Sequence, residues 1–477
     1  MPPESFRYQQ VGQHILAMID ATALVPGQRL PSLRLLSRQL RVSIATVSQA
    51  YLELEKQGII EARTRSGFFV RMPLKSLPKP GPVSRPELAP MVGNRSHLIQ
   101  TVLEAVGHND LLPFGVTGAA PQLLPGRQLA HLLAAECRRT PDQVLAYEQI
   151  AGNLDLRRQV AVYLMHRGIN AAPDDILITN GAMEALYIAV RMLTRPGDNV
   201  LVQSPTYYCF LQLLENCGLR TIEIPSHPQT GVHPADLRQA LDRFDIRACI
   251  LAPNFNNPDG SLTTAEARRE IVDLLSERRI PLIEDDVYGD VHFGPERPGT
   301  CKALDFDGLV VYCNSFSKTV SAGYRLGYML PGRYYRQALE IKSTTNVSSA
   351  TPTQRALAAY LRQGLFDRHL KRLCRILEQQ MQTMQLHLGR HFPPGTAVTR
   401  PRGGTALWLE LPGAVDSVDY FYRARQMGIG VVPGMAFSTQ DRFRNYVRLS
   451  CNGLWNERMA AGIRSLGELA AEMAREK

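Results

Sequence analysis

The sequence has few of the features that mark a membrane, secreted or metal-binding protein. No stretch approaches the roughly 20 consecutive apolar residues that a membrane-spanning helix needs, and the N-terminal MPPESFRYQQ is too polar for a secretory signal peptide. The eight cysteines form no CxxC pair, and the eleven histidines show neither HxH nor HExxH spacing. Scattered cysteines of this kind are typical of reduced thiols. We therefore expect a cytoplasmic protein with no metal site and no membrane partner.

Composition indicates a large globular protein with an uneven charge. The 477 residues are 44% hydrophobic and 21% charged, an ordinary balance that excludes a disordered or fibrous chain. The length is enough for about three domains, or for one large α/β domain and a smaller one. Half of the net charge of +10 lies in the first 75 residues, which hold ten Lys and Arg against five Asp and Glu. A small basic module indicates a polyanion partner, with a solvated basic surface as the alternative.

The first 72 residues have the pattern of a helix-rich winged helix-turn-helix domain. Apolar residues at helical spacing predict a first helix over about residues 6–20. Ser32 and Ser43 can cap two further helices, and Gly58 is placed to end the last of them. The predicted inward face of these two helices consists of Leu33, Leu36, Leu40, Ile44, Val47, Tyr51 and Leu54. Residues 59–70 then alternate as two short strands, which adds a basic hairpin to the helices.

The polar side of the third predicted helix is suited to DNA. Its short polar groups can approach base edges in a major groove, and arginines on the preceding helix and on the hairpin can neutralise phosphates. The candidate DNA-binding residues are Arg34, Arg38, Ser43, Ala45, Thr46, Gln49, Arg63 and Arg65. A small helical domain that binds another protein is the alternative. We favour double-stranded DNA because basic and small polar residues occur together on this module.

A proline-rich segment separates this module from the rest of the chain. Five prolines fall between Ser76 and Pro90, which favours extended backbone and predicts an interdomain linker over residues 73–108. Over residues 109–477, apolar β-rich runs alternate with helix-length segments, as in a parallel sheet covered on both faces. The runs are Ile176–Thr179, Val200–Val202, Ala248–Leu251, Pro281–Ile283 and Leu309–Tyr312. The sequence therefore predicts a large α/β domain after the linker.

The segment NSFSKT, residues 314–319, carries the most specific chemical signal. Lys318 lies just past an apolar strand, and a lysine amine in a partly desolvated cleft can form a Schiff base with an aldehyde. Ser315, Ser317 and Arg325 are close in sequence and suit a phosphate group. Pyridoxal 5'-phosphate (PLP) has both an aldehyde and a phosphate. Because a lone surface lysine would be commoner, this prediction depends on the neighbouring residues.

Two other strand ends offer groups for the ring of this cofactor. Asp285 follows an apolar strand and could pair with the pyridine nitrogen, which would keep the ring protonated and able to accept electrons. Tyr288 and Asn257 could hydrogen-bond the phenolic oxygen of the ring. Taken singly, a strand-end acid can also be a helix cap, and the sequence NNPDG can be an ordinary turn.

A helix start and a tyrosine complete the predicted cofactor set. Gly181 lies between a strand and a helix, where the free N–H groups of Ala182 and Met183 can form an anion site for the phosphate. Tyr207, in the sequence SPTY, could stack on the ring. An ordinary core tyrosine is nearly as good an explanation for Tyr207.

These motifs carry two family resemblances. The segment PGQRLPSLRLLSRQLRVSIATVSQAYLELEKQGIIEARTRSGFFV resembles the DNA-binding domain of the GntR family of bacterial regulators, over nearly all of residues 5–72. The segments around Gly181, Asn257, Asp285 and Lys318 together resemble the fold-type I, aspartate-aminotransferase-like family of PLP proteins, over about residues 110–470. The second resemblance implies a small C-terminal α+β subdomain at about residues 345–477.

The aminotransferase resemblance implies roles for single residues. The catalytic residues would be Lys318, Asp285 and Tyr288, and the cofactor-binding residues would be Lys318, Asp285, Asn257, Tyr288, Tyr207, Ala182, Met183, Ser315, Ser317, Arg325 and Tyr147. Tyr147 matches a tyrosine that reaches the phosphate of the partner subunit, which implies an obligate homodimer. Arg448, in YVRLS, matches the arginine that holds a substrate α-carboxylate with two parallel hydrogen bonds.

A GntR-type DNA-binding domain joined to an aminotransferase-like domain resembles the MocR subfamily of transcriptional regulators. This resemblance implies a cytoplasmic bacterial homodimer that binds an operator with paired half-sites. It also implies that PLP, or its adduct with a small amino compound, changes how the dimer binds DNA. The competing hypothesis is a working PLP-dependent aminotransferase that acts on an amino acid and a 2-oxo acid. A scaffold without cofactor is a third reading, against which Lys318 argues.

Overall fold

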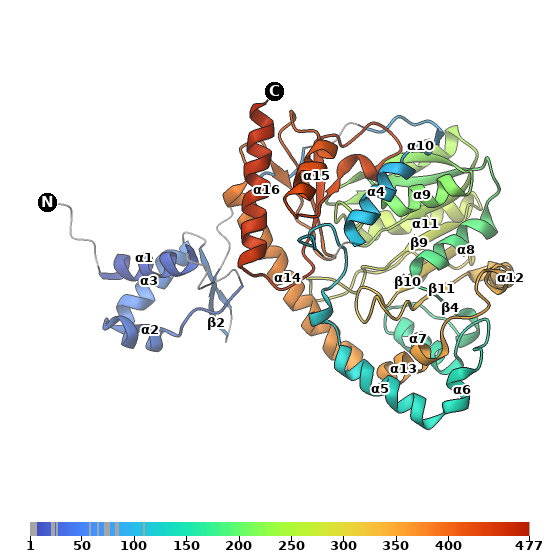
Figure 1. Ribbon diagram of the computed structural model, residues 1–477, viewed down its shortest axis with the longest axis horizontal. Coiled ribbons are helices and arrows are strands. Elements are labelled where there is room, and N and C mark those ends of the chain that lie inside the picture. Colours follow the sequence, from blue (N-terminus) through green and yellow to red (C-terminus); the bar gives the residue numbers. More distant parts are fainter. Residues whose placement is uncertain are drawn as a thin grey trace. The chain divides into compact units, whose positions relative to one another are not determined.

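The protein is described by a computed structural model that covers residues 7–20, 24, 27–56, 59–63, 66–70, 77–81, 85–107 and 110–476 (Figure 1). The chain divides into two compact units, of which the smaller contains residues 1–78, 378–392 and 455–468 and the larger contains residues 79–377, 393–454 and 469–477. Within the described ranges, no helix is both long enough and apolar enough to cross a lipid bilayer.

The N-terminal residues form a winged helix-turn-helix, as the sequence predicts. Its elements are α1 (Arg7–Asp20), α2 (Leu33–Leu40), α3 (Ile44–Lys56) and the antiparallel hairpin of β1 (Ile60–Arg63) and β2 (Gly67–Val70). The Ser32 hydroxyl accepts a hydrogen bond from the Leu35 N–H at 3.2 Å and so caps α2. Arg41 ends this helix in the left-handed conformation, with φ of 51°.

Ile44 does not face inward as its spacing predicts, and that prediction is wrong. Its side chain is 49% exposed, whereas Val47, Tyr51 and Leu54 on the same helix face are almost fully buried. Ile44 is the first residue of α3, so its side chain lies at the end of the packed core. The helical period therefore gives the correct face but not the limit of the core along the helix.

The large unit is built on a nine-stranded sheet. The described strands are β3 (Met91–Val92), β4 (Leu177–Thr179), β5 (Asn199–Ser204), β6 (Arg220–His227), β7 (Gly231–Val232), β8 (Ile246–Leu251), β9 (Leu282–Asp285), β10 (Val310–Ser315) and β11 (Gly327–Leu330). Their order is β3-β6-β5-β8-β9-β10-β11-β4, with β7 paired to β6. Neighbours from β6 to β10 are parallel, and their apolar runs are buried on both faces, as is typical of parallel sheets.

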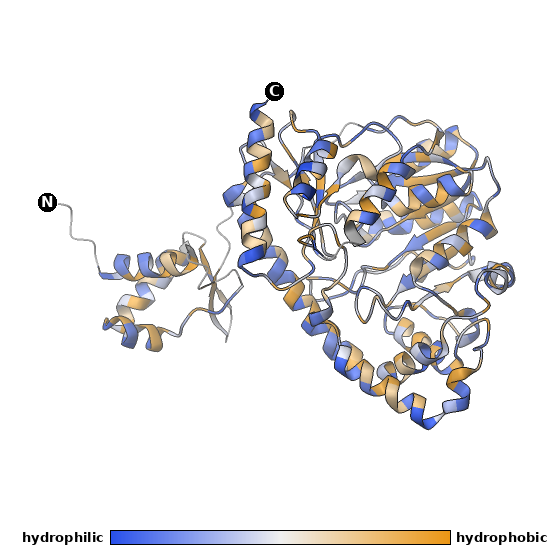
Figure 2. Ribbon diagram, viewed as in Figure 1, coloured by the Kyte–Doolittle hydropathy of each residue, from blue (hydrophilic) through white to orange (hydrophobic). Residues whose placement is uncertain are grey.

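The sheet is mixed rather than purely parallel, which corrects the sequence-based prediction. β11 runs antiparallel between β10 and β4, and β3 pairs antiparallel with β6. The flanking helices are α5 (Gly126–Arg139), α6 (Pro141–Leu145), α7 (Leu154–Met165), α8 (Ala182–Leu193), α9 (Tyr208–Asn216), α10 (Pro234–Arg243), α11 (Ala265–Glu277), α12 (Tyr335–Thr345) and α13 (Thr351–Arg362). Figure 2 shows apolar strands between helices whose outer sides are hydrophilic.

The predicted linker, residues 73–108, is linker-like only in its first part. β3 joins the main sheet, and α4 (Ser96–Gly107) packs on α9. Ile99, Val102 and Ala105 of α4 are fully buried or nearly so. The prediction is wrong for this helix because its apolar spacing, and not the preceding prolines, decides where it packs.

A second sheet lies near the C-terminal end of the large unit. It is antiparallel, in the order β12 (Ala397–Val398), β13 (Ala406–Glu410), β15 (Tyr446–Ser450) and β14 (Val432–Pro433). The helices of this part of the chain are α14 (Leu365–His391), α15 (Ser417–Gln426) and α16 (Glu457–Arg475). Trp408 of β13 is buried and stacks on Tyr446 of β15, with ring centroids 5.3 Å apart.

Candidate functional site

A cavity of about 340 Å³ lies at the carboxyl ends of the parallel strands of the large unit. The carboxyl ends of parallel strands meet at one edge of a sheet, so segments that follow different strands converge there. The lining residues are Leu103, Thr117, Ala182, Met183, Leu186, Tyr207, Cys209, Phe210, Ala252, Asn254, Asn256, Asn257, Asp285, Val287, Tyr288, Ser315, Ser317, Lys318 and Arg325. Ten of the eleven residues predicted to bind the cofactor are in this set.

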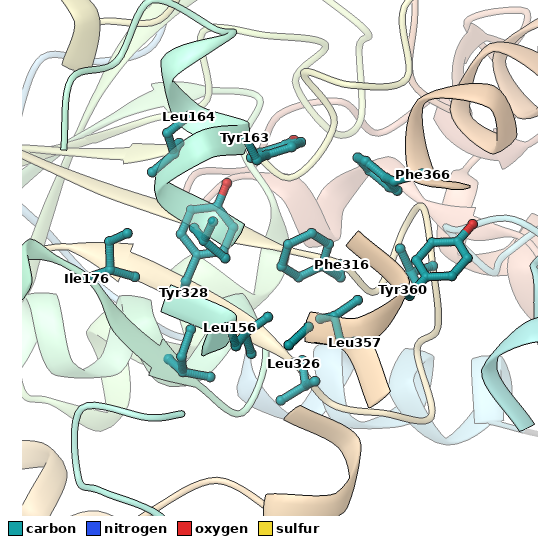
Figure 3. Packing of buried hydrophobic residues seen from close by; sticks show 14 of the residues in the cluster. Leu156, Tyr163, Leu164, Ile176, Phe316, Leu326, Tyr328, Leu357, Tyr360 and Phe366 are labelled. Atoms are coloured by element: carbon teal, nitrogen blue, oxygen red, sulfur yellow. The ribbon is translucent and has the colours of Figure 1, made fainter. Parts of the chain in front are cut away.

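The Lys318 amine faces this cavity from the turn that follows β10. Phe316, two residues earlier, is buried and packs with Tyr328 and Phe366, with ring centroids 5.6 and 6.1 Å away (Figure 3). Because Phe316 is part of the turn, its packing in this aromatic cluster holds the turn in place. The Lys318 Nζ donates to the Thr117 carbonyl oxygen at 2.9 Å and lies 5.4 Å from the centroid of the Tyr288 ring.

Asp285 and Tyr288 are buried polar residues with few hydrogen-bond partners: the Asp285 carboxylate accepts one backbone N–H, and the Tyr288 hydroxyl has no partner within the described ranges. Burial raises the pKa of Asp285 to about 7, and the charge of Asp286 adds to this, whereas the Val287 N–H and Lys318 lower it. The Val287 N–H donates to the Asp285 carboxylate at 3.2 Å. The Tyr288 hydroxyl is buried and has no hydrogen-bond partner within the described ranges. Buried polar groups are nearly always paired, so both groups indicate that the cavity receives a polar ligand.

The opposite end of the cavity collects donors around the start of α8. Gly181 precedes this helix with φ of 76°, and the N–H groups of Ala182 and Met183 belong to its first turn. Arg325 donates to the Asn180 carbonyl oxygen at 3.1 Å and approaches the Ser317 hydroxyl at 3.5 Å. A helix N-terminus beside a guanidinium and hydroxyl groups is an anion site.

Replacement of Gly181 by alanine is expected to weaken PLP binding at least about tenfold. The added Cβ would lie 2.6 Å from an Arg325 nitrogen, so the guanidinium would have to move. Gly168→Ala is the matched control, because Gly168 has a similar φ of 74° but no atom within 4 Å of the added Cβ. Both variants should lose stability from the strained φ. Equal PLP affinity of the two variants in absorbance titrations would contradict the assignment.

Arg448 and Tyr147 lie outside the cavity lining. Arg448 of β15 is fully buried, and it donates to the Asn257 side-chain oxygen at 3.2 Å and to the Gly115 carbonyl oxygen. Arg448 therefore contacts the lining residue Asn257 but does not itself line the cavity. Tyr147 is 89% exposed and does not reach the cavity of its own chain.

Sequence reasoning missed nine lining residues, for two reasons. Asn254 and Asn256 belong to the motif that also holds Asn257, so their proximity in sequence could have indicated them. The others are Leu103, Thr117, Leu186, Cys209, Phe210, Ala252 and Val287. Leu103 and Thr117 reach the cavity from segments far from any strand end, and nothing in their own sequence neighbourhood signals it.

The candidate DNA-binding residues of the winged unit are mostly exposed. Arg34, Arg38, Ala45 and Gln49 are at least partly exposed. The Ser43 hydroxyl accepts a hydrogen bond from the Thr46 N–H at 3.0 Å and so caps the start of α3. The Ser43 and Thr46 hydroxyls also hydrogen-bond each other at 2.8 Å. The Arg65 residue and the side chain of Arg63 lie outside the described part of the chain.

Comparison with known proteins matches both units. Residues 7–70 match bacterial regulatory proteins of the gntR family, and residues 122–466 match the aminotransferase class I and II family. The HTH-type transcriptional regulator YjiR of Escherichia coli K12 is 34% identical to 97% of this chain, over 98% of its own length. The regulator YdcR of the same strain is also 34% identical, over 98% of this chain and 99% of its own length.

The large unit has enzyme relatives as well. A 2-aminoadipate transaminase of Thermus thermophilus is 30% identical over 77% of this chain and 92% of its own length. The crystal structure of LysN, the α-aminoadipate aminotransferase of that bacterium, is complexed with N-(5'-phosphopyridoxyl)-L-leucine. It superposes with a TM-score of 0.74 at 28% identity, covering 80% of this chain and 95% of LysN. The chain therefore belongs to the GntR-type transcriptional regulators of the MocR kind, which join a GntR DNA-binding domain to a class I and II aminotransferase domain.

Proposed function

We propose that this regulator senses PLP, or an amino compound joined to PLP, through Schiff-base chemistry at Lys318. One observation carries the proposal: the Lys318 amine and the buried Asp285 carboxylate face one cavity in a chain that also holds a GntR DNA-binding domain. We further propose that the protein acts as a cytoplasmic homodimer. Purified protein should then show a visible absorbance band that an added amino acid shifts.

The residues around the cavity fit PLP. The donors beside Gly181 and Arg325 suit its phosphate, and the buried Asp285 carboxylate suits a protonated ring nitrogen. The unpartnered Tyr288 hydroxyl suits the phenolic oxygen. Asn257 accepts from Arg448 through its side-chain oxygen, which leaves its amide nitrogen to donate toward the same phenolic oxygen.

PLP, when bound, supplies an aldehyde that forms a Schiff base with amines and a ring that accepts electrons. The chain supplies the rest. Lys318 provides the amine, and its bond to the Thr117 carbonyl oxygen holds Nζ in the cavity. Asp285 holds a proton at the ring nitrogen, and Tyr207, which lines the cavity, offers an aromatic face to the ring.

Arg448 is the proposed receptor for the α-carboxylate of an amino compound. Its guanidinium donates one bond to the side chain of the lining residue Asn257 and another to the Gly115 carbonyl oxygen. A carboxylate would compete with the Gly115 carbonyl oxygen for these donors, and the bond between two opposite charges would be the stronger of the two. An amino acid with a free carboxylate is therefore expected to shift the spectrum more than the corresponding amine does.

The proposed homodimer rests on Tyr147 and its surroundings. Tyr147 is 89% exposed and Leu145 is 87% exposed, in a protein whose other large apolar side chains are mostly buried. Neighbouring exposed apolar side chains mark an interaction surface. In a dimer, Tyr147 would be available to the phosphate site of the partner subunit, and two DNA-binding domains would be available for paired half-sites.

Arg34→Ala combined with Arg38→Ala is expected to weaken binding to DNA taken from upstream of the protein's own gene. Because this slope is negative, each lost phosphate contact should make the slope of log affinity against log salt shallower by about 0.9. Fluorescence anisotropy at several salt concentrations measures this slope. Arg269→Ala is the control, because Arg269 is an exposed residue of α11 in the large unit. A double variant with an unchanged slope would remove α2 from the DNA interface.

The second candidate function is a working aminotransferase. The similarity to a 2-aminoadipate transaminase favours it, and the buried Arg448 guanidinium suits a substrate carboxylate in an enzyme as well as in a sensor. Repeated turnovers with an amino acid and a 2-oxo acid would support the enzyme. A spectral shift without turnover, together with salt-dependent binding to the upstream DNA, would support the sensor.

A further inference from the structure

One glutamine side chain holds the backbone of the proline-rich segment. The Gln440 Oε1 accepts from the Glu87 N–H at 2.9 Å, and the Gln440 Nε2 donates to the Glu87 carbonyl oxygen at 2.9 Å. Gln440 is buried, whereas Glu87 is exposed. A single carboxamide therefore satisfies both backbone groups of one linker residue, as a neighbouring β-strand would.

Further contacts fix the residues on either side, which we call the docked segment (residues 85–95). Arg95 pairs with Asp441 at 2.6 Å, and its Nε lies 3.4 Å from the Ser438 carbonyl oxygen. Arg85 pairs with Asp236 of α10 at 3.0 Å. Within the docked segment, β3 is held by its pairing with β6. Glu87 and Arg95, on either side of β3, are both held by one stretch of chain, the 438–442 loop (Ser438–Arg442).

The 438–442 loop is itself tied to the main sheet. The Ser438 hydroxyl and the Thr439 N–H both donate to the buried carboxylate of Glu223 on β6, at 2.7 and 2.6 Å. Arg442 donates to the Ser204 hydroxyl at the end of β5, at 2.8 Å. These buried charge-assisted bonds tie the loop to β6 and to the end of β5.

The same loop leads directly into the strand that carries Arg448. β15 begins at Tyr446, four residues after the loop ends, and Arg448 bonds the Gly115 carbonyl oxygen and the Asn257 side chain. A ligand carboxylate at Arg448 would compete for these two bonds and so change how the Arg448 side chain of β15 is held. The loop is the short covalent connection through which that change reaches Glu87.

We propose that Gln440 is a latch that couples the occupancy of the cavity to the docked segment. This inference rests on the proposed function, since it takes Arg448 as the ligand's carboxylate receptor. With the latch closed, both Glu87 bonds are made, as in this structure. A ligand with an α-carboxylate weakens them and frees the segment between the DNA-binding domain and β3. PLP alone has no such carboxylate and leaves the latch closed.

Hydrogen exchange of the full-length protein measures the latch at the Glu87 amide. The probes are PLP and N-(5'-phosphopyridoxyl)-L-alanine, which adds the α-carboxylate with the smallest chiral side chain. In the wild type, the adduct should speed exchange of the peptide that contains Glu87 about fivefold or more relative to PLP. Gln440→Ala should exchange at the fast rate with either probe. Gln440→Glu, which keeps the acceptor but loses the donor, should lie between them.

Gln229→Ala is the control for Gln440→Ala. Gln229 is an exposed glutamine that follows β6, the strand to which the 438–442 loop is bonded, and it makes no hydrogen bond with Glu87. It should exchange like the wild type with both probes. Two results would contradict the latch but leave the proposed sensing function intact. In the first, the adduct binds but the Glu87 amide exchanges equally fast with both probes. In the second, Gln440→Ala keeps the slow exchange rate with PLP. If the adduct does not bind, as its absorbance would report, the proposed function fails and the latch fails with it.

Discussion

Replacement of Lys318 by alanine is expected to abolish covalent capture of PLP. The wild type incubated with PLP should show a visible absorbance band, and borohydride reduction should add the mass of the cofactor to the peptide that contains Lys318. The variant should show neither, because the only amine among the cavity-lining residues is that of Lys318. Absorbance spectra and mass spectrometry of the digested protein measure both effects.

Lys371→Ala is the matched control for Lys318→Ala. Lys371 is an exposed lysine of α14 and does not line the cavity, so its loss should leave the band and the adduct unchanged. Reduced adduct found on another lysine would contradict the assignment of Lys318. So would a wild-type protein that gains no band with PLP.

Asp285→Asn is expected to stabilise the cofactor-free protein at pH 8 and to weaken PLP binding. Burial raises the pKa of Asp285 to about 7, above its unfolded value of about 3.9. A raised folded pKa gives a stability contribution that is complete below about pH 4 and is lost as the pH rises to about 7. Asparagine does not ionise and avoids this loss. The free energy of unfolding should therefore rise by up to about 4 kcal/mol at pH 8, and by less at pH 5.5.

The same change removes the proposed carboxylate partner of the ring nitrogen. A charge-assisted hydrogen bond contributes about 1.5–3 kcal/mol, so PLP affinity should fall roughly 10- to 150-fold at pH 8. Thermal unfolding without PLP and absorbance titration with PLP measure the two effects. An Asp285→Asn protein that is less stable than the wild type at pH 8 would show that the carboxylate has a structural partner.

Asp286→Asn provides the contrasting control. Asp286 is the next residue and is also buried, but it accepts from Asn254 at 2.8 Å and from Tyr312 at 2.6 Å and pairs with Arg297. Removing one member of a buried ion pair costs about 3–5 kcal/mol. This variant should be less stable than the wild type at both pH values. The two neighbouring acids should thus respond with opposite sign.

Residues next to strand ends could be predicted, because the rule that brings them together is local. Lys318, Asp285 and Asn257 each follow an apolar run, and the carboxyl ends of parallel strands share one edge. Leu103 and Thr117 could not be predicted in this way. They enter the cavity from segments whose position depends on the packing of α4 and on hydrogen bonds from Asn452, which follows β15.

The proline-rich segment illustrates the same limit. Its composition correctly indicates extended backbone around Glu87, but composition carries no information about a partner 353 residues away. The antiparallel return of β11 and the exposure of Ile44 were missed for a similar reason. Hydrophobic period determines which face of an element is apolar, whereas neighbours from elsewhere in the chain determine whether that face is covered.

The sequence by itself determined the two domains, the family of each and ten of the residues that line the cavity, because short motifs and local periodicity encode these features. Only the tertiary structure decided that burial raises the pKa of Asp285, that Tyr288 has no partner within the described ranges and that Gln440 holds Glu87. Burial and long-range hydrogen bonds arise when distant segments meet, and their energies are absent from any local stretch of the chain.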